Sequence, residues 1–78
     1  MNPKQTTIKN LKAGQFFYML KDLKHPNNKK FKVYQNIQLP KEPKAMVMNR
    51  LELSYIDDNG IERGFRMIRE RYLTIFIV

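Results

Sequence analysis

The sequence predicts an all-β domain built from five short strands. Three features of the chain favour this class. Apolar and aromatic residues fall in short runs, turn-forming residues separate these runs at close spacing, and no stretch carries the long repeat of an amphipathic helix. A barrel or a compact sandwich would satisfy this pattern. Closure into a barrel would remove the strand edges that favour aggregation, so a small five-stranded barrel is the architecture that we expect.

The 78 residues are expected to form one small domain over residues 1–78. The first fifteen positions are mostly polar, with isolated apolar positions at Ile8 and Leu11, and Gly14 ends this segment. A flexible arm outside the folded domain is one option for residues 1–10. The aromatic-rich run FFYMLKDL at residues 16–23 then predicts the first strand.

The second strand is expected in FKVYQNI at residues 31–37, after the turn-forming HPNN at residues 25–28. Regular alternation along this run separates its side chains onto two faces. One face is expected to hold Phe31, Val33 and Ile37, and the other Lys32, Tyr34 and Asn36. Two prolines then make QLPKEPK at residues 38–44 an irregular loop.

A hairpin is expected in the second half of the chain. Propensity leaves a helix as an alternative for MVMNRLEL, but DDNG at residues 57–60 is a turn signal, and IERGFRMI at 61–68 follows it directly. The pattern therefore favours strands at 45–57 and 61–68. On the first of these strands, alternation places Leu51, Leu53 and Tyr55 opposite Arg50, Glu52 and Ser54.

The last part of the chain predicts a closing strand. RERY is expected to form either a short turn or one helical turn near residues 68–72. The β-branched run LTIFIV at residues 73–78 predicts the fifth strand. Because this strand is apolar and lies at the end of the chain, pairing with a second copy is one expectation, which would give a homodimer.

The layout of the chain resembles small SH3-like β-barrels, of the kind common among bacteriophage proteins. The resemblance rests on LKAGQFF at residues 11–17, an irregular basic loop, the DDNG hairpin and a short apolar closing strand. It covers most of the chain in layout, but in residues only L-K-x-G-x-x-F. It implies a binding module, and since such domains include nucleic-acid-binding and protein-binding members, it does not choose the ligand.

Positive charge is confined to one half of the chain. The net charge is +8, and residues 1–44 hold all ten lysines against Asp22 and Glu42. Residues 45–78 hold all five arginines against five acids. An even mixture of signs would keep the protein in solution equally well, so the segregation indicates a polyanionic partner or an acidic protein surface.

Nucleic acid is the partner that this pattern favours. Lysines would neutralise phosphates, and Tyr34 would stack on a base. Lysine lacks the planar fork with which arginine reads guanine, so binding should depend on salt and little on sequence. The alternatives are solvated lysines that discourage edge pairing and a tyrosine that caps the barrel end. The predicted binding residues are Lys21, Lys24, Lys29, Lys30, Lys32, Tyr34, Lys41 and Lys44.

The sequence does not favour an enzyme, a metal or a cofactor. It has no cysteine, His25 is its single histidine, Ser54 its single serine, and no glycine-rich phosphate loop occurs. The N-terminal residues lack the apolar run of a signal peptide, and the apolar run at 73–78 is too short to span a bilayer. A cytoplasmic protein without membrane contact is expected.

A second hypothesis is a phage-type protein that binds and modulates a host protein. Met46, Met48 and the apolar C-terminal strand would supply contact area, and the lysines would steer the chain to an acidic surface.

Overall fold

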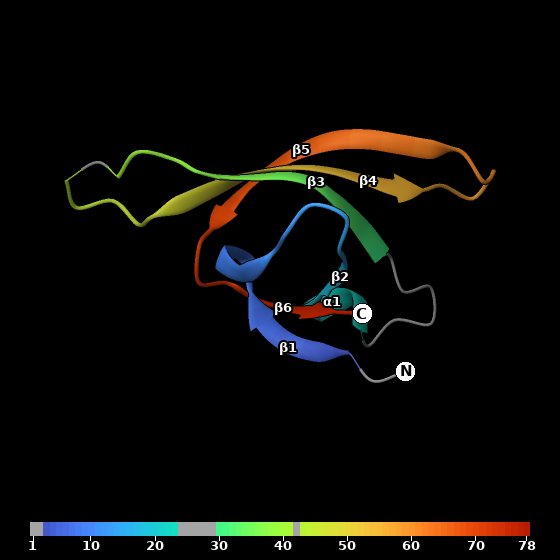
Figure 1. Cartoon of the computed structure of the whole chain (residues 1–78), viewed down its shortest axis with the longest axis horizontal. Coiled ribbons are helices and arrows are strands. Elements are labelled where there is room, and N and C mark those ends of the chain that lie inside the picture. The colour runs from blue at the N-terminus through green and yellow to red at the C-terminus, as the bar shows by residue number, and fades with distance from the viewer. Residues whose placement is uncertain (1–2, 24–29, 42) are drawn as a thin grey trace.

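The computed structural model describes residues 3–23, 30–41 and 43–78, and these form one antiparallel sheet of six strands in the order β1-β6-β2-β3-β4-β5 (Figure 1). The strands are β1 (Lys4–Thr7), β2 (Phe16–Met19), β3 (Lys30–Gln38), β4 (Met48–Ile56), β5 (Glu62–Glu70) and β6 (Thr74–Ile77). Two short helical segments join them, the 3₁₀ helix η1 (Ile8–Asn10) and α1 (Leu20–Leu23). The all-β class is therefore confirmed.

The sheet has six strands and is open, where the sequence predicted a barrel of five. The additional strand is β1, which pairs with β6 over four positions from Lys4–Ile77 to Thr7–Thr74. Among the described strands, β1 and β5 are the two edges and do not pair with each other. The run KQTT carries no apolar alternation, so its extended conformation depends on pairing with β6. Thus part of the segment for which a flexible arm was an option is a strand.

The helical segments lie elsewhere than predicted. No helical turn forms near residues 68–72, because β5 continues to Glu70 and the chain then turns at residues 71–72. The Leu73 N–H closes this turn on the Glu70 carbonyl at 3.2 Å. Conversely, the strand predicted over 16–23 ends at Met19, which is the last β2 position paired with β6, and the chain continues as α1. The predicted turn at 25–28 lies outside the described residues.

The hydrophobic core lies between the two halves of the bent sheet, with β1, β6 and β2 in one half and β3, β4 and β5 in the other (Figure 1). The 3₁₀ helix and the segment after it contribute buried apolar side chains, so the N-terminal region is part of the core. The buried apolar residues are Ile8, Leu11, Phe17, Phe31, Val33, Leu51, Leu53 and Ile75. The Phe31 ring contacts Phe17 and Phe65 at centroid distances of 5.6 and 5.4 Å, which links β2 to β5 across the sheet.

The hairpin predicted at DDNG is confirmed. Asp57 holds the turn, since its Oδ1 accepts hydrogen bonds from the backbone N–H groups of Asn59 and Ile61, each at 2.9 Å. Gly60 has a φ of 77°, a conformation that glycine adopts without strain. On β4 the predicted alternation also holds, with Leu51 and Leu53 buried and Tyr55 packed against the core.

A β-bulge in β3 changes the faces predicted for its second half. Val33 pairs with Leu53 and Gln35 with Glu52, so Tyr34 is an extra residue without a partner position on β4. Beyond it the alternation is reversed. Asn36 lies opposite the buried Leu51, and Ile37 lies opposite Arg50, so the predicted faces of these two β3 residues were wrong.

The reversal brings Asn36 to the interior, where its side chain organises the N-terminal segment. Its Nδ2 donates to the carbonyl oxygens of Ile8 at 2.9 Å and Leu11 at 3.0 Å. Its Oδ1 accepts a hydrogen bond from Nδ2 of the buried Asn49 at 2.7 Å. One amide thus satisfies both ends of the 3₁₀ segment and ties it to β3 and β4.

We expect Asn36→Ala to lower the free energy of unfolding by about 2 kcal/mol, because it leaves two carbonyls and the Asn49 amide without this partner. Urea denaturation followed by circular dichroism measures the change. The exposed neighbour Gln35 is the control, and Gln35→Ala should change stability by about 0.5 kcal/mol or less. Equal stability of the two variants would contradict this role of Asn36.

Candidate functional site

The outward surface of β2, β3 and β6 gathers four aromatic rings and two lysines. On β2, Phe17 is buried and its neighbours Phe16 and Tyr18 point to the other face by strand alternation. In the ladders, Phe16 lies opposite Lys32, and Tyr18 lies between Phe76 on β6 and Lys30 on β3. We call this surface the lysine–aromatic face, consisting of Phe16, Tyr18, Lys30, Lys32, Tyr34 and Phe76.

The two lysines of the lysine–aromatic face lie over its exposed rings. Lys30 Nζ is 4.9 Å from the centroid of Phe16, and Lys32 Nζ is 5.9 Å from the same centroid. Lys32 Nζ is also 5.1 Å from the centroid of Tyr34. Such cation–π contacts are weak at exposed sites, about 0.5 to 1 kcal/mol, so the ammonium groups remain available for other partners.

A carboxylate orients the Tyr34 ring. The Tyr34 hydroxyl donates to Glu62 Oε2 at 2.7 Å, and the hydroxyl of Ser54 donates to the same oxygen at 3.0 Å. These hydrogen bonds, with the nearby charge of Lys32, hold the pKa of the Glu62 carboxyl below its ordinary value, and the Tyr34 bond contributes most. Glu62 therefore stays ionised and places one negative charge at the edge of the face.

Among the described residues, arginines form ion pairs and lysines do not. The three ion pairs within the described residues all use arginines, with Arg50 and Arg66 at Glu52 and Arg63 at Asp57. No lysine of the described residues forms an ion pair. Two acids of the second half, Glu52 and Asp57, thus pair with arginines of that half, and the lysines among the described residues have no carboxylate of these residues at contact distance.

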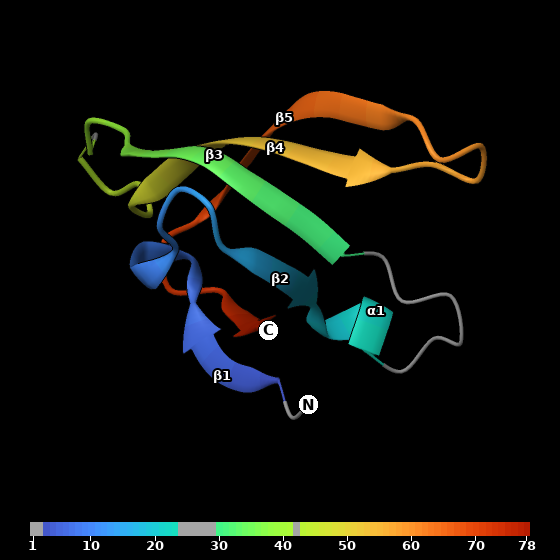
Figure 2. The ribbon, with the colours of Figure 1, turned by 45° about the vertical axis from the view of Figure 1, so that its right-hand side comes forward.

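The structure separates the predicted binding residues into groups. Lys30, Lys32 and Tyr34 lie together on β3. The exposed Lys41 and Lys44 lie in the β3–β4 connection, at the opposite end of β3 from Lys30 (Figures 1 and 2). Since β3 runs about 26 Å from its first to its last residue, these two lysines cannot share a short ligand with the lysine–aromatic face. The predicted Lys24 and Lys29 lie outside the described residues.

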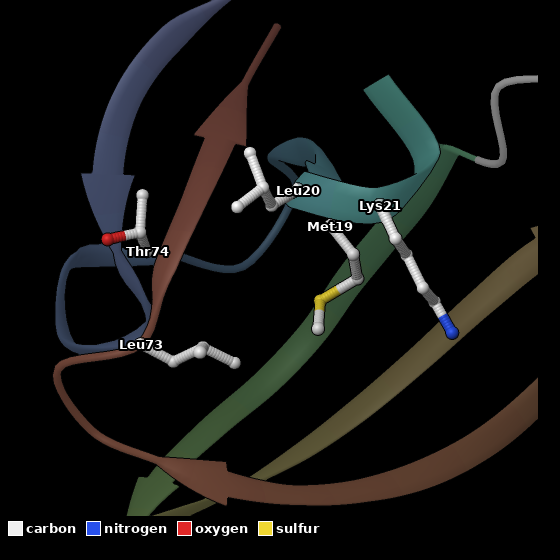
Figure 3. A pocket seen from close by; sticks show the side chains of 5 residues that line it. All are labelled: Met19, Leu20, Lys21, Leu73 and Thr74. Carbon is white, nitrogen blue, oxygen red and sulfur yellow. The ribbon is translucent and has the colours of Figure 1, made fainter. Parts of the chain in front are cut away.

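Lys21 occupies a third position, in α1, where it lines an apolar hollow. This hollow has a volume of about 640 Å³ and lies between α1 with the end of β2 and the start of β6 (Figure 3). Figure 3 shows the side chains of Met19 and Leu73 pointing toward the space between these elements. Leu20 and Thr74 complete the lining, so Lys21 is the single charged residue among them.

Three residues of the lysine–aromatic face were not among the predicted binding residues. Strand alternation places Phe16 and Tyr18 on the face opposite to Phe17, but alternation alone does not tell which of the two faces is buried. Phe76 could have been found only from the pairing of β6 with β2, which joins positions far apart in the sequence. For Phe16 and Tyr18 the available signal was the lysines at the opposing β3 positions.

The C-terminal strand has no free edge for the expected homodimer. β6 lies between β1 and β2 and pairs with both, so its backbone hydrogen-bonding groups face strands of its own chain. Pairing through a sheet edge would have to use β1 or β5 instead.

Comparisons with known proteins assign no function to this site. Comparisons of the chain with protein-family models, with curated proteins and with solved structures find no match. Within the described residues, no three His, Cys, Asp or Glu side chains lie close enough together to hold a metal ion. Neither helical segment of the described chain is long and apolar enough to cross a membrane.

We expect Tyr34→Phe to raise the pKa of Glu62 toward its ordinary value, because the variant removes the hydrogen bond that lowers this pKa most. A carboxyl ¹³C NMR titration measures it. Since the folded-state pKa is lowered, ionised Glu62 stabilises the fold above its unfolded-state pKa, and this contribution is lost as the pH falls through the lowered value. In the variant this loss on acidification should shrink.

Asp57 provides the internal control for this titration. Its pKa is lowered by the Ile61 N–H and by Arg63, neither of which the Tyr34 variant touches. The pKa of Asp57 should therefore stay low. An unchanged Glu62 pKa in the variant would show that the Tyr34 hydroxyl does not hold this carboxylate in solution.

Proposed function

We propose that this protein is a non-enzymatic module that binds nucleic acid through the lysine–aromatic face. The observation that carries the proposal is the placement of Lys30 and Lys32 over exposed rings on one sheet surface, where neither ammonium group forms an ion pair with a described carboxylate. Ammonium groups capture phosphates, and ring faces accept bases, so the two kinds of side chain together match the two parts of a nucleotide.

The distribution of charge along the chain supports the same partner. Lys30 directly follows the basic stretch of residues 21–29 in the sequence, and residues 1–44 have a net charge of +8. Glu62 places one opposing charge at the edge of this face, where it accepts hydrogen bonds from Tyr34 and Ser54, and the two ammonium groups of Lys30 and Lys32 outnumber it. Long-range attraction of a polyanion followed by contact at the rings is the mechanism that these features support.

The proposal includes a relation of this sheet to the SH3-like barrels that the layout of the chain resembles. A strongly bent antiparallel sheet with a short apolar closing strand is compatible with an opened SH3-like barrel, in which β1 and β5 remain unpaired with each other. In this proposal the outward surface of β2, β3 and β6 binds the ligand, and the inward surface forms the core.

We expect the protein to bind DNA or RNA oligonucleotides with an affinity that falls steeply as salt rises. The double variant Lys30→Gln/Lys32→Gln should reduce the slope of log K against log salt by about 1.4 to 1.8, since each lost phosphate contact removes about 0.7 to 0.9. Fluorescence anisotropy with labelled oligonucleotides at several salt concentrations measures this slope.

The charge-matched control is Lys41→Gln/Lys44→Gln at the other end of β3, which should leave the slope nearer to that of the unmodified protein. Absence of binding at low salt would contradict the proposal. If a protein partner is instead captured from a nuclease-treated lysate while oligonucleotides do not bind, the host-protein hypothesis replaces it.

A further inference from the structure

We infer, building on the nucleic-acid function proposed above, that the ligand is single-stranded, with one base stacked on Phe16 and a nearby base on Tyr34. The inference starts from ring exposure. Phe16 is 38% exposed and Tyr34 48% exposed, although both are large and lie on a sheet whose inward face carries the core. Exposed aromatic side chains on strands of a curved sheet are the platforms on which unpaired bases stack.

A duplex does not use such platforms. Its bases are stacked on each other and present only their edges in the grooves, and the elements that read these edges are inserted helices or β-ribbons. The rings of the lysine–aromatic face lie on neighbouring strands within the sheet. A strand with accessible base faces therefore fits this surface better than a duplex does.

The spacing of the two exposed rings suits consecutive parts of one strand. The centroids of Phe16 and Tyr34 lie 5.9 and 5.1 Å from the same atom, Lys32 Nζ, so they are no more than about 11 Å apart. Neighbouring or next-neighbouring nucleotides of an unstacked strand can span this separation. Lys32 lies between the two platforms, where the linking phosphate would lie, and Lys30 lies on the Phe16 side.

The free protein is prepared for this arrangement. Each lysine lies over a ring that a base would occupy, and its flexible stem allows the ammonium to move from the ring to the adjacent phosphate. The Tyr34 ring is held by its hydrogen bond to Glu62, so it does not need to be ordered when a base arrives. Binding thus exchanges weak cation–π contacts for ion pairing and stacking.

The test compares one oligonucleotide as a single strand and as a blunt duplex, with ring-removing and ring-keeping variants. We expect tighter binding of the single strand. Phe16→Leu and Tyr34→Leu should each weaken single-strand binding by about 5-fold or more, since stacking on one base contributes about 1 to 3 kcal/mol. Phe16→Tyr keeps the ring and should weaken binding much less than Phe16→Leu. Tyr34→Phe keeps the ring but loses its hydrogen bond to Glu62, so its affinity should lie between those of the unmodified protein and Tyr34→Leu.

Two further readouts separate stacking from charge and from misfolding. The ring-removing variants should leave the salt slope unchanged, because they remove no cation. Tyr72→Leu removes an exposed ring outside the lysine–aromatic face and should change neither the affinity for the single strand nor the salt slope. In the unmodified protein, NMR should show upfield shifts of the Phe16 and Tyr34 ring protons on addition of the single strand, a measurement that needs no variant to fold.

The outcomes distinguish this inference from the function on which it rests. If oligonucleotides bind with a lysine-dependent salt slope, but the duplex binds as tightly as the single strand or the ring variants behave like Tyr72→Leu, stacking is refuted and the proposed function stands. Ring protons that do not shift on binding refute it equally. If no oligonucleotide binds at low salt, both proposals fail.

Discussion

Strand β3 connects the two halves of the sheet, and the bulge at Tyr34 determines which of its side chains face the core. Its first residues pair with β2 and its remaining length pairs with β4, so every other strand is placed directly or indirectly by this one. With an uninterrupted alternation, Asn36 would point to solvent, and the carbonyl groups of Ile8 and Leu11 would lose the hydrogen bonds that its side chain donates. The extra residue, Tyr34, thus turns the Asn36 amide toward the N-terminal segment while its own ring stays exposed on the outward face.

Lysines and arginines have different partners in this sheet. Three arginines of the hairpin β4–β5 pair with acids of the same hairpin, and in the pair of Arg66 with Glu52 the guanidinium group donates a hydrogen bond of 2.7 Å across the two strands. Lysines of β3 instead lie over rings of β2 and of β3 itself. A hydrated ammonium on a flexible stem exchanges partners readily, so the surface that carries lysines is better suited to a mobile polyanion than the surface that carries arginines.

Local chemistry explains the parts of the fold and site that the sequence predicted. The DDNG turn depends on an aspartate that accepts hydrogen bonds from residues two and four positions later, and Leu51 and Leu53 follow the two-residue period of a strand. Lys30, Lys32 and Tyr34 were predicted together because they lie within five positions of one strand. Lys41 and Lys44 were grouped with them by charge alone, and the length of β3 separates them from the face.

The all-β class, the β4–β5 hairpin and the concentration of lysine in the first half of the chain were predictable from the sequence, since each follows from short-range pattern or from composition. The tertiary structure alone decided that Lys4–Thr7 pairs with β6, that β3 carries a bulge, and that Phe16, Tyr18 and Phe76 lie on one outward surface. The reason is the same in each case: these features depend on which strands pair and in which register. Contacts between residues distant in the sequence determine the pairing and the register, and the local alternation of apolar and polar residues does not report such contacts.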